Sequence, residues 1–96
     1  MKHQPEDPAG SILLYPNPAG DKVSLQMELP EEELVRIDLF NVAGSLVQTI
    51  QPQQAVRKGY YQVNGDISGL AVGMYWVVVQ SGEKLIVKPL VITRRN

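Results

Sequence analysis

Apolar and polar residues alternate strictly over residues 23–29, and this pattern constrains the fold more than any other feature. Val, Leu, Met and Leu occupy the odd positions, with Ser, Gln and Glu between them. Successive side chains of a strand point to opposite faces, so the segment predicts a strand with one buried face. The alternation returns at residues 35–39, and short apolar segments follow at 46–50, 59–63 and 74–80. No long window shows a helical period, so the chain is predicted to be all-β.

Turn-forming residues separate these segments. Residues 16–18, Pro-Asn-Pro, end an apolar run at 12–15, because two prolines remove two backbone donors. Residues 34–50 predict a hairpin that turns around Gly44. A second turn at Ser81-Gly82-Glu83 leads into a final strand. The sequence therefore predicts a seven-stranded antiparallel immunoglobulin-like β-sandwich.

Three further stretches carry specific expectations. Residues 51–58 are polar and lack a strong pattern, and residues 64–66, Asn-Gly-Asp, are a strong turn signal. Residues 66–73 predict an irregular crossover whose Ile67 and Leu70 reach the core. Residues 74–80 are the densest apolar segment, and we predict that they form a central strand.

The composition argues against most catalytic classes. The 96 residues fit one domain and contain no cysteine, which excludes disulfides, zinc–thiolate sites and thiol nucleophiles. The single histidine, His3, lies in a predicted flexible linker over residues 1–11, so a Ser-His-Asp arrangement has no ordered base. The acidic residues 31–33 follow a proline and fit a solvated loop better than a catalytic pair. We therefore expect no enzymatic activity in this domain, no cofactor and no metal.

Charge and hydropathy narrow the partners. Residues 1–48 hold three basic and eight acidic residues, whereas residues 49–96 hold six basic and two acidic ones. This asymmetry is far weaker than the basic stripe of a nucleic-acid-binding protein, so no nucleic acid partner is expected. No apolar run approaches the roughly 20 residues of a membrane helix, and the first residues do not form a signal peptide. We expect no membrane insertion, and an exported protein would need this chain to be part of something larger.

The last segment, residues 84–93, is apolar on both faces and is interrupted by Lys88-Pro89. Proline suits an edge strand or a bulge, and lysine discourages edge pairing. The segment then runs into the basic pair Arg94-Arg95. An apolar strand with a cationic terminus is a handle for a partner, by strand addition, or an ordinary final strand with a solubilising end. The same edge offers a route to a homodimer.

Four motifs, taken in order, resemble the C-terminal sorting domains of the type IX secretion system (Por secretion system) of Bacteroidetes. They span about residues 12–95, with Pro89 and Arg94-Arg95 as departures from the usual closing strand. The motifs lie at residues 14–23, 35–44 and 66–75, followed by a basic closing strand. The motif residues are Pro16, Asn17, Pro18, Gly44 and Gly69, with Gly73-x-Tyr75 and the lysines Lys84 and Lys88.

The resemblance implies transport rather than chemistry. Such domains follow cargo that reaches the periplasm, are recognised by the outer-membrane translocon, and are usually removed by a cell-surface sortase, although some are retained. The expected location is the periplasm in transit and then the cell surface or the medium. Residues 12–96 are assigned to the sorting domain, with recognition predicted at Gly73, Tyr75, Lys84, Lys88, Leu90, Val91, Ile92, Thr93, Arg94 and Arg95.

Three finer expectations follow. A sortase cut is predicted near Ala9, Gly10 and Ser11, where small residues would let the backbone enter an active site. Deletion of residues 92–96 is predicted to trap cargo in the periplasm. Gly73 is expected to allow a close approach of neighbouring chain.

Two other functions remain open from the sequence. A carbohydrate-binding or adhesive accessory sandwich would need a flat row of exposed rings, with Phe40 and Tyr60 or Tyr61 as candidates. A structural spacer would predict that removal of the domain leaves localisation unchanged. Tyr75 and Trp76 are expected to fill the core or line a sheet face.

Overall fold

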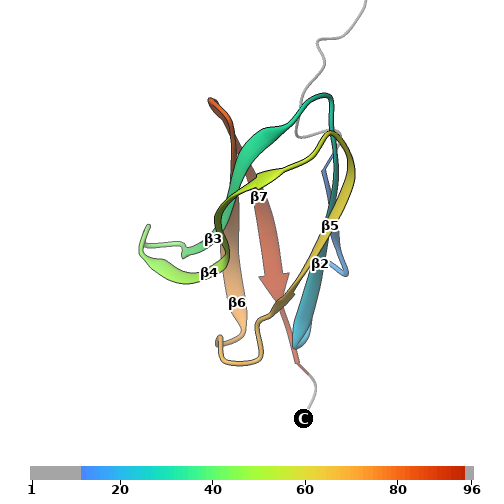
Figure 1. The fold of residues 1–96 in the computed structure, drawn as a ribbon. Coiled ribbons are helices and arrows are strands. Elements are labelled where there is room, and N and C mark those ends of the chain that lie inside the picture. The colour runs from blue at the N-terminus through green and yellow to red at the C-terminus, as the bar shows by residue number, and fades with distance from the viewer. Residues whose placement is uncertain (1–11, 95–96) are drawn as a thin grey trace, which may run out of the picture.

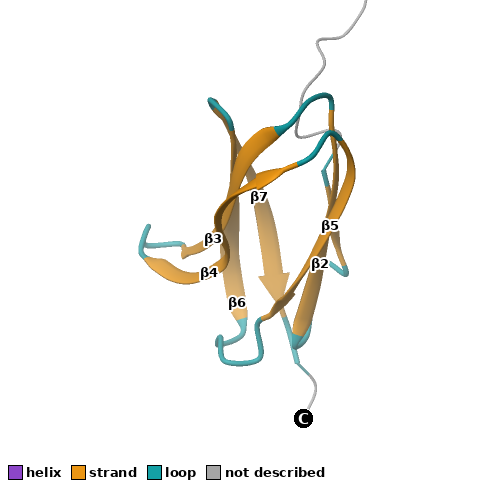
Figure 2. Cartoon of the chain, in the orientation of Figure 1, coloured by secondary structure: helices purple, strands orange, loops and turns teal. Residues whose placement is uncertain are grey.

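Seven antiparallel strands form two packed sheets in the computed structural model, which describes residues 12–94 (Figure 1). Figure 2 shows only strands and connecting loops in this part of the chain. One sheet has the order β1-β2-β5 and the other the order β4-β3-β6-β7. The predicted immunoglobulin-like β-sandwich is confirmed. The strands are β1 (Leu13–Tyr15), β2 (Lys22–Leu29), β3 (Glu33–Asn41), β4 (Leu46–Val56), β5 (Gly59–Asp66), β6 (Gly73–Ser81) and β7 (Lys84–Ile92).

The core lies between the sheets and is built by the alternation seen in the sequence. The odd-numbered apolar residues of β2 are buried, and so are those of β3 and β6. Ile67, in the crossover between β5 and β6, is fully buried, and Leu70 packs against the same cluster, as predicted. Burial of one large aliphatic side chain contributes about 1.5–3 kcal/mol, so these positions provide most of the favourable energy.

Residues 51–58 differ from expectation, because β4 continues through residue 56. Three register shifts interrupt the pairing of β3 with β4, so the strand does not keep a simple alternation. Gln51 is buried although its side chain is polar. Its Nε2 donates to the carbonyl of Val35 at 3.1 Å. The exposed Pro52 lies between the shifted pairs, as expected for an edge strand.

Residues 64–66 also differ from expectation. They do not turn but complete β5, where Asn64 pairs with Ser24 of β2. A Cβ atom at Gly65 would lie 3.2 Å from the side chain of Ile50. The glycine therefore allows close packing between the sheets rather than a tight turn.

The strand order fixes the positions of the last two strands. β6 lies between β3 and β7, which confirms that residues 74–80 belong to a central strand. β7 lies at the edge of the four-stranded sheet, where Pro89 pairs with Trp76. An edge position tolerates a proline, because one side of the strand needs no ladder hydrogen bonds.

Candidate recognition surface around the last strand

Residues 16–18 lead the chain from the end of β1 to the edge of the other sheet, before it returns to the first sheet as β2. The Tyr15–Pro16 and Asn17–Pro18 peptide bonds are both cis, and β1 ends immediately before them. Ala19 then forms an isolated parallel bridge with Ile92 of β7. Its N–H donates to the carbonyl of Val91 at 2.8 Å, and its carbonyl accepts from the N–H of Thr93 at 2.9 Å. This segment therefore covers the second half of the β7 edge, more than 70 residues away in sequence.

The side chain of Asn17 extends this cover. Its Nδ2 donates to the carbonyl of Pro89 at 3.0 Å, and its Oδ1 accepts from the N–H of Val91 at 3.0 Å. One side-chain amide thus occupies the place of a peptide unit in a neighbouring strand. An amide provides a donor and an acceptor together, which a carboxylate or a hydroxyl does not in this arrangement. The motif asparagine is explained by this contact.

Arg94 joins the end of the last strand to two loops. Its Nε lies 2.8 Å from Oδ1 of Asp21, whose side chain is 65% exposed. The guanidinium also donates to three backbone carbonyls, those of Leu70 at 2.6 Å, Ile67 at 2.9 Å and Gly20 at 3.1 Å. The planar fork of arginine suits several acceptors at once. Arg94 is therefore engaged within the fold rather than free as a cationic tail.

Tyr75 and Gly73 shape the start of β6. Tyr75 is buried, and its hydroxyl donates to the carbonyl of Ala71 at 2.6 Å, four residues upstream. Immunoglobulin-like domains have a comparable tyrosine corner. Gly73 has a φ of 148°, and no atom lies within 4 Å of a Cβ placed there. The expected close approach at Gly73 is therefore wrong, and its positive φ accounts for the glycine.

The other two motif glycines differ from each other. Gly44 has a φ of 87° in the turn between β3 and β4. There Oδ1 of Asn41 accepts from the N–H groups of Ala43 and Ser45 at 3.0 and 2.9 Å. Gly69 has neither a positive φ nor a close neighbour, and nothing in the structure explains a glycine there.

The predicted recognition residues divide by exposure. Lys84, Val91 and Thr93 are exposed, and Lys88 is half-buried on the core side of the edge. Leu90 and Ile92 are core residues, like Tyr75. Arg95 and the predicted cut at Ala9, Gly10 and Ser11 lie outside the described residues.

This geometry changes how the predicted effect of deleting residues 92–96 is interpreted. The deletion removes Ile92, which is 1% exposed, together with the Arg94 contacts. Loss of a buried Ile side chain and a hydrogen-bonded arginine destabilises the sandwich itself. Retention of the truncated protein would report unfolding as well as lost recognition.

The aromatic rings do not form a single row. Tyr60 is exposed on the three-stranded sheet, whereas Phe40 and Trp76 are paired and half-buried on the outer face of the four-stranded sheet. Tyr61 is half-buried, and its hydroxyl donates to Oε1 of Gln51. Trp76 lines a sheet face and Tyr75 fills the core, as predicted. This division of the rings does not match the flat platform of a carbohydrate-binding module.

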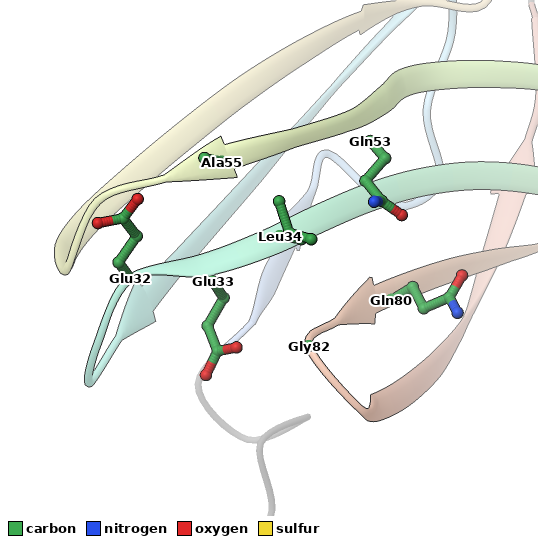
Figure 3. A pocket seen from close by; sticks show the side chains of 7 residues that line it. All are labelled: Glu32, Glu33, Leu34, Gln53, Ala55, Gln80 and Gly82. Atoms are coloured by element: carbon green, nitrogen blue, oxygen red, sulfur yellow. The ribbon is translucent and has the colours of Figure 1, made fainter.

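The acidic segment forms one wall of a shallow hollow of about 600 Å³ (Figure 3). Figure 3 shows the carboxylates of Glu32 and Glu33 on opposite sides of the ribbon, with Glu33 directed towards Gly82. They do not form a carboxyl pair of the kind used in acid–base chemistry. Within residues 12–94, no three His, Cys, Asp or Glu side chains lie together in a way that could hold a metal ion.

One carboxylate has a shifted proton affinity. The backbone N–H of Ser68, and then its hydroxyl, hold the pKa of Asp66 below its usual value. Both bonds lie at the exposed end of β5 and act locally.

Residues 12–94 contain no helix that is long and apolar enough to cross a membrane.

Together these features define a small immunoglobulin-like β-module whose distinctive contacts gather around its last strand. The family model for secretion system C-terminal sorting domains matches residues 13–93, so the chain belongs to that family. It is a C-terminal sorting signal of type IX secretion, which implies interaction with that machinery and export to the surface or the medium. Sorting-signal domains are typically non-catalytic. None of the curated proteins compared with the chain matches it.

Proposed function

We propose that this domain takes a larger cargo protein from the periplasm through the type IX outer-membrane translocon, for surface attachment or release. The observation that carries the proposal is that β7 is held firmly in the sheet while several of its side chains remain accessible. Residues 17–19 and Arg94 hold this strand in place, while Lys84, Lys88 and the outward side chains remain accessible. An ordered edge strand with accessible side chains suits recognition of the folded domain.

Exposed and buried residues would have different parts in recognition. The exposed Lys84, Val91 and Thr93, together with the half-buried Lys88, are available for contact with the translocon. Tyr75, Leu90, Ile92 and Arg94 would act by keeping the strand in position, since their side chains are occupied inside the domain. Substitutions in the second group should therefore reduce export in proportion to lost stability.

The test of the main proposal is a fusion of residues 1–96 behind a signal peptide and a fluorescent reporter, expressed in a host with type IX secretion. Cells are fractionated, and the same fusion is followed in a strain without the translocon. The proposal expects reporter at the surface or in the medium, and periplasmic reporter in the mutant strain. Periplasmic retention of a folded fusion in both strains would contradict it.

We also propose that a cell-surface sortase cuts near Ala9, Gly10 and Ser11. Ile12, the first described residue, is 4% exposed, so a cut beyond it would remove a core side chain. N-terminal sequencing of the released domain tests the site, and a start within residues 12–30 would refute it. A domain that stays attached to its cargo would instead indicate a retained member of the surface attachment complex.

A further inference from the structure

The outer face of β6 and β7 is mostly apolar, and no segment among residues 12–94 covers it. Antiparallel sheets with one solvated face usually place polar residues outward. β2 follows this rule, since its outward positions hold Lys, Ser, Gln and Glu. On β7, in contrast, Leu85 is 63% exposed and Val87 is 49% exposed. The other outward apolar residues of the two strands are Met74, Trp76, Val78, Pro89 and Val91.

These side chains form one continuous strip. The register places Val87 beside Val78 and Pro89 beside Trp76, and Trp76 in turn lies beside Phe40 of β3. A shallow hollow of about 630 Å³ lies over this strip. Exposed apolar areas of this kind mark interaction sites more often than single exposed residues do.

Among residues 12–94, the outer edge of β7 is left without a backbone partner only over its first half. Val91 and Thr93 direct their hydrogen-bonding groups away from β6, towards Asn17 and Ala19. Every second residue of a strand points the same way, so Leu85 and Val87 also direct their N–H and C=O groups outward. Pro89 has no N–H, and its carbonyl accepts from Asn17. The edge accessible to a new strand is therefore limited to residues 85–87.

The edge on the other side of the same sheet is less suitable. β4 contains the exposed Pro52, and its pairing with β3 has three register shifts. Bulges and prolines are devices that prevent strand addition. The free segment of β7 has neither, and it adjoins the apolar strip directly.

The charges around residues 85–87 indicate which kind of segment can pair with this edge. Lys84 and Lys88 flank the segment, and neither forms an ion pair with any residue among 12–94. A second copy paired antiparallel about residue 86 would place Lys84 opposite Lys88 twice. Like charges directly opposite each other destabilise a strand pair. Acidic side chains at the same positions would meet the lysines favourably.

We propose that residues 85–87 pair with an extended segment of a secretion-machinery protein. This segment carries apolar side chains that cover the strip and acidic ones that meet Lys84 and Lys88. This inference rests on the proposed function and names the chemistry of the partner. The machinery would then recognise the half of β7 that the Pro-Asn-Pro segment leaves open.

The test uses the reporter fusion with three variants and one control. Val87→Pro removes one outward N–H, in the alternate-residue position that Pro89 already tolerates. Leu85→Asn changes one exposed apolar side chain, and Lys84→Glu reverses one flanking charge. Lys58→Glu, at the exposed turn between β4 and β5, is the matched charge control. Thermal unfolding of each purified domain checks that it remains folded.

The expected result is a roughly tenfold loss of exported reporter for Val87→Pro and Leu85→Asn, the ratio that about 1.4 kcal/mol of lost binding gives. Lys84→Glu should lose several-fold, and Lys58→Glu should match the wild type. Wild-type export of the Leu85→Asn and Lys84→Glu variants would overturn the inference. So would a purified domain that is dimeric and becomes monomeric on Val87→Pro, because the occupant would then be a second copy. Retention of the wild-type fusion would instead refute the proposed function.

Discussion

Replacing Arg94 by alanine removes a side chain that joins the end of β7 to two loops. Four hydrogen bonds are lost, one to Asp21 and three to backbone carbonyls, all between 2.6 and 3.1 Å. The Arg94 side chain is 26% exposed, so water can replace some of these bonds after the substitution. The three carbonyls come from residues 20, 67 and 70, which lie far from position 94 in sequence.

The magnitude follows from these contacts. A hydrogen bond to a charged group contributes about 1.5–3 kcal/mol when it is well shielded, and less where water has access. We therefore expect Arg94→Ala to cost about 2–4 kcal/mol in total. For a domain of this size, each kcal/mol lowers Tm by about 4–8 °C, which gives a shift of roughly 8–32 °C. Arg94→Lys keeps the charge but loses the fork, so it should lose about half as much.

Urea and thermal unfolding of the purified domain, followed by circular dichroism, measure this difference. Asp21→Ala is the internal control. It removes the exposed half of the ion pair alone, and such surface pairs contribute about 0–1 kcal/mol. The reasoning fails if Arg94→Ala unfolds within about 2 °C of the wild type, well short of that shift. It also fails if Asp21→Ala is equally destabilising, because the carbonyl contacts would then contribute nothing.

Three further predictions concern the loops and the strand ends next to them. Asn17→Asp keeps the acceptor but loses the donor to β7, and should lower the unfolding free energy by about 1 kcal/mol in urea titration at neutral pH. Gly73→Ala should cost about 1–2 kcal/mol because of its φ, whereas Gly69→Ala should be neutral, as compared by Tm. The pKa of Asp66, followed by carboxyl NMR, should lie below its usual value and rise in Ser68→Ala. Because this folded-state pKa is depressed, the carboxylate stabilises the domain above its unfolded pKa, and that contribution disappears as the pH falls through the folded value.

The strands that carry a buried face were predictable from the sequence. Residues 23–29 alternate because one side of β2 faces the core, and the burial pattern follows the letters directly. The second half of β4 was not predictable in the same way. Its bulges interrupt the alternation of apolar and polar residues. Because β4 is an edge strand, this half is mostly polar and has no apolar face that the sequence could reveal. The misplaced turn at residues 64–66 has a similar origin, since packing against Ile50 rather than local turn geometry selects Gly65.

The candidate surface was predictable only in part. The edge position of β7 followed from Lys88-Pro89, because each residue has a local reason to avoid the middle of a sheet. The partners of Asn17 and Arg94 lie across long separations in sequence, and no local pattern encodes them. A basic tail and a hydrogen-bonded arginine look identical in sequence, and only the fold separates them.

The position of Arg94 also has a consequence for the timing of folding. A chain is synthesised from its N-terminus, so the carbonyls of residues 20, 67 and 70 leave the ribosome before the guanidinium that joins them. The sandwich is complete only after residue 94 has emerged, and any domain that precedes it in the same polypeptide has by then been made. A prematurely terminated cargo therefore lacks a finished signal. If the machinery recognises the folded domain, as proposed above, export of the cargo depends on complete translation of the polypeptide.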